Sequence, residues 1–251
     1  MIHVELIRET PIEPSLWSSW HELAGGIPMR QPEWLLSWWD CYQPNDSELF
    51  VLTARDDHRL LGLLPFYRLK SQRQLRLLGD GDVCTDYNGL LCAPDHDQSM
   101  IVEALCTWLI AKCKDSEVGW ESIYMEGIPD SDTTTRSLYN LIAQRGGQAL
   151  ERNQMNTWCL DVTDGWDGYL ARSSKDTRKR LRRRFESLAE VQIHQVQSKA
   201  DWDRYFPILI DLHQKRRNSL GEPGCFADAR FQSFLEPVSY THLTLPTILR
   251  V

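Results

Sequence analysis

Strand-like and helix-like segments alternate along the chain, and this alternation most constrains what the sequence can fold into. The stretch HVELIRE alternates apolar and polar residues, as an edge strand does. Apolar residues recur at helical spacing over 15–24 and again over 32–42, where Pro32 favours a helix start. The tryptophans of 32–42 are predicted to pack in the core. Apolar runs bounded by turn residues predict strands at 49–55, 60–69, 75–79 and 88–92.

The alternation continues through the middle of the chain. Helices are predicted at 98–113 and 133–147, and strands at 121–128 and 157–162. We therefore expect residues 1–163 to form one domain of the α/β (α+β) class, with a mixed sheet flanked by helices. The stretch TDGWDG, residues 163–168, is expected to join it to a second part at 164–237. That part holds a basic helix, a predicted strand at 191–196 and a predicted helix at 201–219.

Charge and cysteine content exclude several classes of protein. The net charge of −7 argues against a general binder of DNA or other polyanions, whose domain is usually basic overall. None of the seven cysteines forms a C-x-x-C pair and no histidine pair has metal spacing, so free thiols in a reducing cytosol are expected and no metal site. The sequence shows neither a secretory signal nor an apolar run long enough to span a membrane. We expect a cytoplasmic protein.

The last fourteen residues, 238–251, do not continue the pattern. Residues 238–247 match one reading frame of a transposon-type sequencing-library adapter, and 248–250 would be encoded by a sample index. The adapter then continues with a codon for Val251 and a stop. The alternative is a genuine β-rich end. We interpret 238–251 as an adapter-derived artefact that replaced the natural sequence beyond Glu236.

The segment KDTRKRLRRRFESLAE, residues 175–190, has seven basic residues in its first ten positions. Ser173 and Asp176 form a capping pattern, which predicts a helix start at Ser173 or Ser174. Arg178 shares the face of Leu181, Phe185 and Leu188, and Arg182 lies at its edge. An arginine in that place must extend to solvent, pair with an acid or bind an anion. The basic helix is compatible with a solvated surface and with a ligand-binding site. Binding of nucleic acid or of a membrane surface agrees less well with its residues.

A second apolar stripe lies further along the chain and contains Trp202, Phe206, Leu209 and Ile210. His213 lies in its centre, and Arg216 and Arg217 continue the same side. A buried, hydrogen-bonded histidine and a catalytic one are both compatible with this pattern. Pro207 is tolerated in a first turn or at a kink, so this helix is expected to start late or to bend.

Several segments together resemble one known family. They are QPEWLLSWW, LLGLLPFYR, LRLLG with DYNGLL around Asp86 and Tyr87, SSKDTRKRLRRRFESLAE and LHQKRRNSLGEPGCF. The chain resembles the cellulose-biosynthesis acetyltransferases (CelD/BcsL-like) of the GNAT superfamily, which are related to FemAB/FemX-type transferases. The resemblance implies two GNAT-like halves in tandem, the second of them incomplete here.

The resemblance also implies an activity. It would be transfer of an acyl group from acetyl-CoA or another acyl-CoA, as co-substrate, to an amine or hydroxyl of a sugar or polysaccharide precursor. Arg178, Arg182, Arg216, Asp86 and Tyr87 would bind substrate, and His213 would carry a proton. The alternatives are a FemX-like aminoacyl transferase that uses charged tRNA, and a non-catalytic accessory protein of exopolysaccharide assembly. The sequence does not indicate an oligomeric state.

One motif departs from the family pattern. The residues RLLGDG, 76–81, match the consensus sequence of the superfamily's pyrophosphate loop. However, the negative charges of Asp80 and Asp82 would repel a pyrophosphate, and no helix is predicted directly after the segment. We interpret it as a turn that imitates the motif. The true cofactor loop would lie beyond Glu236, so no cofactor-binding residue is assigned and this copy is expected to be inactive.

Overall fold

The computed structural model describes residues 1–57, 59–81, 83–153 and 156–244. The chain divides into two compact units, of which the first comprises Met1–Ala149 and Ser198–Val251 and the second Leu150–Gln197. The tandem arrangement, with domains at 1–163 and 164–237, stays a prediction.

Unit 1 is built from a sheet and its covering helices. Its strands are β1 (Ile2–Ile7), β2 (Ser47–Asp56), β3 (Arg59–Leu69), β4 (Gln74–Leu77), β5 (Leu91–Cys92) and β6 (Ser122–Tyr124). Its helices are α1 (Pro14–Ala24), η1 (Pro28–Arg30), α2 (Pro32–Tyr42), α3 (Gln98–Lys112), α4 (Thr133–Gln144), α7 (Lys199–Asn218), η2 (Cys225–Ala227) and α8 (Ala229–Thr244). Unit 2 contains α5 (Gly165–Arg172) and α6 (Lys175–Ser187).

The sheet of unit 1 is mixed. Its strand order is β1-β2-β3-β4-β6, and β5 pairs with β3 off this path. The pairs from β1 to β4 are antiparallel, whereas β4 and β6 are parallel. A parallel pair needs a long crossover, and α3 lies in the connection between these two strands. The predicted fold class, a mixed sheet flanked by helices, is confirmed.

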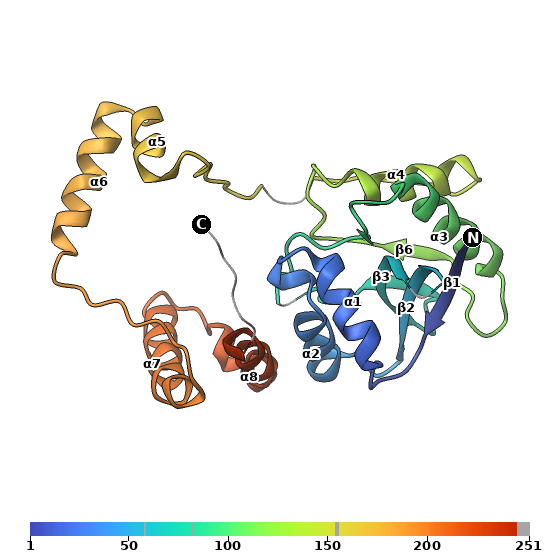
Figure 1. The fold of residues 1–251 in the computed structure, drawn as a ribbon. Coiled ribbons are helices and arrows are strands. Elements are labelled where there is room, and N and C mark those ends of the chain that lie inside the picture. Colours follow the sequence, from blue (N-terminus) through green and yellow to red (C-terminus); the bar gives the residue numbers. More distant parts are fainter. Residues whose placement is uncertain (58, 82, 154–155, 245–251) are drawn as a thin grey trace. The chain divides into compact units, whose positions relative to one another are not determined.

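The two faces of the sheet bury different residues because side chains alternate along a strand. On β2, Phe50 and Leu52 join a core that Leu105 of α3 shares. Leu49 and Val51 pack on the opposite side, with residues of α1 and α2. Figure 1 shows α3 and α4 on one side of the sheet and α1 and α2 on the other. Trp38 and Trp39 of α2 are buried, as the core-packing interpretation predicts.

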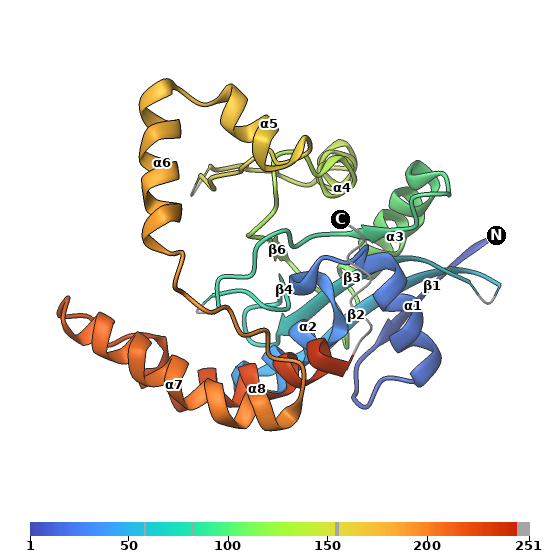
Figure 2. The ribbon, with the colours of Figure 1, turned by 60° about the vertical axis from the view of Figure 1, so that its left-hand side comes forward.

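The last helix, α8, lies against α2, as Figures 1 and 2 both show. Phe234 is fully buried, and its ring meets those of Trp34 and Tyr42 edge-on, with centroids 4.9 Å and 6.1 Å apart. Val238 is buried in the same cluster. Helix α8 therefore crosses the predicted start of the adapter-derived segment, and residues 245–251 lie outside the described residues. The origin of 238–251 stays a prediction.

Two predicted strands are wrong. Residues 157–162 and 191–196 have no strand structure, and Trp158 and Ile193 are 100% and 93% exposed. A strand needs a hydrogen-bonded neighbour, and the sheet provides none for either segment. Helix α5 begins at Gly165, within the stretch 163–168 that is predicted to join the two parts. The predicted strand at 121–128 is reduced to the three residues of β6.

The described residues include no helix that is both long and apolar enough to cross a membrane.

Candidate functional site

Helix α6 of unit 2 is capped by a serine. The Ser174 hydroxyl accepts a hydrogen bond from the backbone N–H of Thr177, so the cap is Ser174 and not the Ser173–Asp176 pair. The helix start predicted at Ser173 or Ser174 is confirmed. Asp176 in the first turn complements the positive end of the helix dipole.

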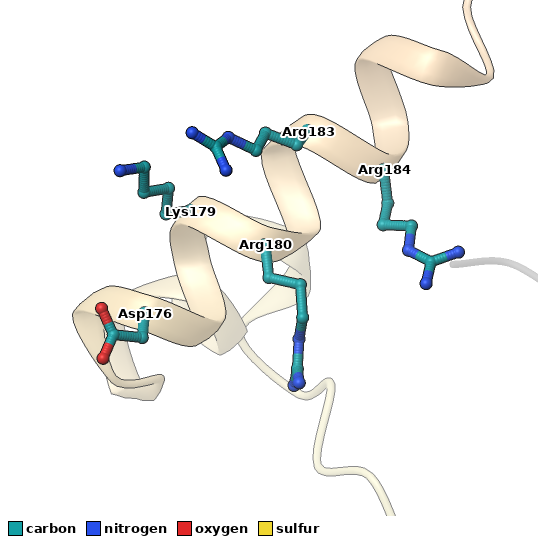
Figure 3. Close-up of a pocket in the computed structure, with 5 residues that line it drawn as sticks. All are labelled: Asp176, Lys179, Arg180, Arg183 and Arg184. Atoms are coloured by element: carbon teal, nitrogen blue, oxygen red, sulfur yellow. The ribbon is translucent and has the colours of Figure 1, made fainter.

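Four cations and one acid of α6 line a shallow cavity of about 330 Å³. We call it the basic pocket, and its residues are Asp176, Lys179, Arg180, Arg183 and Arg184. In Figure 3 Lys179 and Arg183 project to one side and Arg180 and Arg184 to another, as i, i+4 spacing requires. In the described part of the chain, no hydrogen bond or ion pair engages these four side chains. Their mutual repulsion makes the pocket favourable for an anion.

Arg178 does not point into the basic pocket. Its Nη1 donates to the backbone carbonyl oxygens of Ser173, Leu170 and Ala171, at 2.7, 3.3 and 3.3 Å. These carbonyls belong to the last turn of α5 and the residue that ends it, where partners inside the helix are missing. The guanidinium thus joins the end of α5 to the start of α6. Arg182 is exposed and does not line the pocket.

The apolar face of α6 is only partly covered. Phe185 packs edge-on against Trp166 of α5, with ring centroids 4.8 Å apart, yet it remains 56% exposed. Leu188 is 53% exposed. The stripe that the sequence indicates is therefore present, but within unit 2 it is not fully buried.

His213 lies on α7, which begins after the N-cap Ser198 and continues through Pro207, so the late start is wrong. Trp202 and Phe206 stack with centroids 4.1 Å apart. Leu209, predicted on the same stripe, is 54% exposed. His213 itself is half-buried, and Arg216 is exposed.

Polar and aromatic side chains of the described residues surround His213. Its Nδ1 lies 3.1 Å from Oε1 of Gln214, and its Nε2 lies 3.6 Å from Sγ of Cys225. The edge of its ring faces Phe226, with centroids 5.2 Å apart. Both ring nitrogens thus have polar neighbours, which is compatible with a structural role and with proton transfer. The sequence does not reveal the Cys225 contact, because twelve residues separate the two side chains.

Asp86 and Tyr87 lie in the long loop between β4 and β5. The Tyr87 carbonyl accepts a hydrogen bond from Nε of Arg30, and the Asp86 N–H lies 3.1 Å from Sδ of Met29. Tyr87 as a residue is 45% exposed. Backbone contacts therefore hold the loop and leave Tyr87 accessible. Of the predicted substrate-binding residues, Asp86, Tyr87 and Arg216 belong to unit 1, and Arg178 and Arg182 to unit 2.

The turn at residues 76–81 is filled by the protein's own carboxylates. Asp80 is buried, pairs with Nε of Arg76 and accepts a hydrogen bond of 3.0 Å from the Tyr67 hydroxyl. The Gly81 N–H donates to Oε1 of Glu126 at 2.7 Å. Burial raises the pKa of Asp80, and burial together with the Asp80 charge raises the pKa of Tyr67. No helix begins in the described residues between Leu77 and Gln98. These contacts support the interpretation of an imitated motif.

The seven cysteines are all free thiols. Among the residues that the structure describes, no group of three or more His, Cys, Asp or Glu side chains could hold a metal ion.

No family model matches the chain, and no curated protein matches it. Several solved structures are similar to it, and they include the following two. One is a ribosomal-protein-alanine N-acetyltransferase from Brucella melitensis biovar Abortus 2308, with 20% identity and a TM-score of 0.34 over 63% of this chain and 100% of that chain. The other is a transcriptional regulator from Bacillus halodurans C-125, with 16% identity and a TM-score of 0.36 over 62% of this chain and 100% of that chain.

Proposed function

We propose that this chain belongs to an acyl-CoA-dependent acyltransferase of the GNAT type, which acylates an amine or hydroxyl of a sugar or polysaccharide precursor in exopolysaccharide or cellulose biosynthesis. The main support is the mixed sheet of unit 1, in which α3 lies in the connection from β4 to the parallel strand β6 and helices cover both faces. This architecture agrees with what the resemblance of the sequence implies.

The proposed roles follow the chemistry of the side chains. His213 takes the proton of the attacking amine or hydroxyl, since a histidine side chain is the group that most often serves as a general base. Arg182 and Arg216 are exposed cations for an anionic group of a substrate. The exposed Tyr87 offers an aromatic ring and Asp86 a nearby carboxylate to a sugar. Arg178 shapes the start of α6, from which the basic pocket presents its cations.

The test is release of free CoA thiol. The uninterrupted reading frame and the present chain are each incubated with acetyl-CoA, longer acyl-CoAs and a series of amino sugars and glycan precursors. We expect acceptor-dependent thiol release from the uninterrupted protein. His213→Gln should lower kcat by about 10²-fold or more, because a general base is lost. His3→Gln, on the exposed edge strand, is the matched control and should leave kcat unchanged. Absence of thiol release with every acyl-CoA would contradict the proposal.

Substrate binding has a separate readout. Arg182→Ala should raise the KM for one of the two substrates without an equal fall in kcat, since it removes a binding contact rather than the base. Arg178→Ala should raise a KM in the same way, because it removes the contacts that shape the start of α6. Unchanged KM values in both variants would assign these arginines to the structure of unit 2 alone.

A second candidate is an aminoacyl transferase that uses charged tRNA, and the basic pocket favours it. Four cations on one helix can neutralise several phosphates, and such binding weakens steeply with salt. Binding of aminoacyl-tRNA is therefore measured across a salt series, with the Arg180→Glu variant as comparison. A steep salt slope together with aminoacyl transfer would favour this candidate over the acyl-CoA enzyme. A protein with neither activity would match the accessory role in exopolysaccharide assembly.

A further inference from the structure

The thiol of Cys225 is exposed at the surface of unit 1, beside the imidazole of His213. Cys225 begins the short helix η2, and the chain reaches it from α7 through a turn at residues 219–224. A thiol within hydrogen-bond distance of an imidazole has the arrangement of a nucleophile and its base.

A third residue orients the imidazole. Gln214 donates from Nε2 to the carbonyl oxygen of Pro223 at 2.9 Å, and this bond turns Oε1 toward His213. Because Oε1 can only accept, Nδ1 of His213 must carry the proton of that contact. Nε2 then presents its lone pair to the Cys225 thiol. The order of hydrogen bonds thus selects the tautomer that a general base requires.

The backbone at Gly224 is shaped to admit this arrangement. Gly224 has a φ of 74°, and a Cβ at this position would lie 2.3 Å from Oε1 of Gln214 and 3.1 Å from Cβ of Arg217. Any side chain at residue 224 would displace the amide that orients His213. The turn before η2 therefore allows Gln214 to reach between Pro223 and His213.

The surroundings of Cys225 have opposing effects on the pKa of its thiol. Burial of the sulfur raises the pKa of the thiol, whereas the backbone N–H groups of Cys225 and Phe226 and the charge of Arg217 lower it. The thiol is therefore protonated at neutral pH and needs a base when it reacts. The two N–H groups favour the thiolate that leaves when the acyl group moves on.

We propose that Cys225 is a covalent nucleophile that accepts an acyl group from a thioester or an activated ester, with His213 as its base and Gln214 as a positioning residue. This inference rests on the proposed function where the donor is acyl-CoA.

The proposed transfer has two balanced steps. In the first, Sγ attacks the carbonyl carbon of the donor, and its proton moves to Nε2 of His213. The bond between the acyl carbon and the donor's sulfur breaks, and the departing thiolate takes the proton from His213. In the second step, the acceptor's nitrogen or oxygen attacks the S-acyl group and gives its proton to Nε2. Cys225 leaves as a thiolate and recovers that proton.

The first test needs no acyl-CoA. The whole chain is treated with limiting iodoacetamide, and peptide mass spectrometry follows alkylation of Cys225 beside that of the exposed thiols Cys84 and Cys159. With general-base assistance, Cys225 should react about 10-fold or more faster than these internal controls at neutral pH. His213→Gln should remove the advantage and leave Cys84 and Cys159 unchanged. Equal rates for the three thiols in the wild type would overturn the inference.

The positioning role of Gln214 has its own readout, the pH profile of Cys225 alkylation. Gln214→Ala removes the acceptor and should slow alkylation, whereas Gln214→Glu keeps an acceptor and should restore it. The added carboxylate favours the imidazolium, so the profile of Gln214→Glu should shift to higher pH. A profile identical in wild type, Gln214→Ala and Gln214→Glu would remove Gln214 from the proposal.

The second test separates the inference from the proposed function. The chain is incubated with p-nitrophenyl acetate and with acetyl-CoA, and acetylation is located by mass spectrometry, with Cys225→Ser as the control. Acetylation of Cys225 by the ester supports the nucleophile, whatever acetyl-CoA does. Thiol release from acetyl-CoA at equal rates in wild type and Cys225→Ser, without acetylation of Cys225 by the ester, supports the proposed function and overturns the inference. Absence of acetylation at Cys225 with both donors also overturns it.

Discussion

Arg178 donates from Nη1 to the backbone carbonyl oxygen of Ser173 over 2.7 Å and so connects the end of α5 to the start of α6. The sequence places this arginine on the same helix face as apolar residues, where its charge could extend to solvent, pair with an acid or bind an anion. The structure shows a fourth possibility, in which the guanidinium satisfies carbonyls that a helix end leaves without partners. A cation at a helix C-terminus is also favoured by the helix dipole.

This contact predicts a local effect of Arg178→Ala. The backbone amides of α5 should exchange with solvent faster, because the variant loses hydrogen bonds from a charged donor that together contribute about 1.5–3 kcal/mol. Hydrogen exchange of the whole chain measures this. Arg182→Ala removes an exposed arginine of the same helix and should not change exchange in α5. Equal exchange in the two variants would contradict the capping role.

Loss of Phe234 should destabilise unit 1 strongly. Phe234 fixes α8 to α2 through Trp34 and Tyr42, and removal of a fully buried Phe side chain costs about 3–5 kcal/mol. Urea denaturation of Phe234→Ala measures the free energy of unfolding. Leu209→Ala is the control, because Leu209 is 54% exposed and its loss should cost less than about 0.5 kcal/mol. Similar losses in both variants would show that α8 does not pack as described.

The hydrogen bond from Tyr67 to Asp80 predicts a pH dependence. The pKa of Tyr67 is raised in the folded protein, so its contribution to stability is fully present below 10.0, the pKa of an ordinary tyrosine, and is lost as pH rises toward the folded pKa. The unfolding free energy of the wild type should therefore fall more steeply above pH 10 than that of Tyr67→Phe. At neutral pH, Tyr67→Phe should cost about 1–3 kcal/mol, because it leaves a buried carboxylate with one donor fewer. Parallel stability curves above pH 10 would refute the assignment.

The basic pocket should bind a polyphosphate in a salt-dependent way. Tripolyphosphate serves as the probe, and calorimetry measures its dissociation constant across a salt series. Arg183→Glu should weaken binding and reduce the salt slope by about 1, since one phosphate contact is lost. Lys114→Glu makes the same change of charge at an exposed site outside the pocket and should have no such effect. Equal effects of the two substitutions would indicate a response to net charge alone.

Much of the candidate site follows from local sequence rules. Ser174 begins α6 where a capping residue is expected, and the i, i+4 spacing of Lys179 with Arg183 places two cations on one side. The partners of Arg178 and His213 do not follow from such rules. Their positions depend on how α5 meets α6 and how the turn before η2 returns to α7.

The sequence by itself determined α1, α2, α3, α4, α6 and α7 and the strands that the sheet pairs, but not α5 or α8. A helix satisfies its backbone hydrogen bonds internally, and the buried strands β2 and β3 are continuous apolar runs bounded by turn residues, so local pattern suffices for these elements. Only the tertiary structure decided that 157–162 and 191–196 form no strand, and that Cys225 meets His213. A strand requires a neighbour and a side-chain pair requires a shared place in space, and neither is encoded in the spacing of residues along the chain.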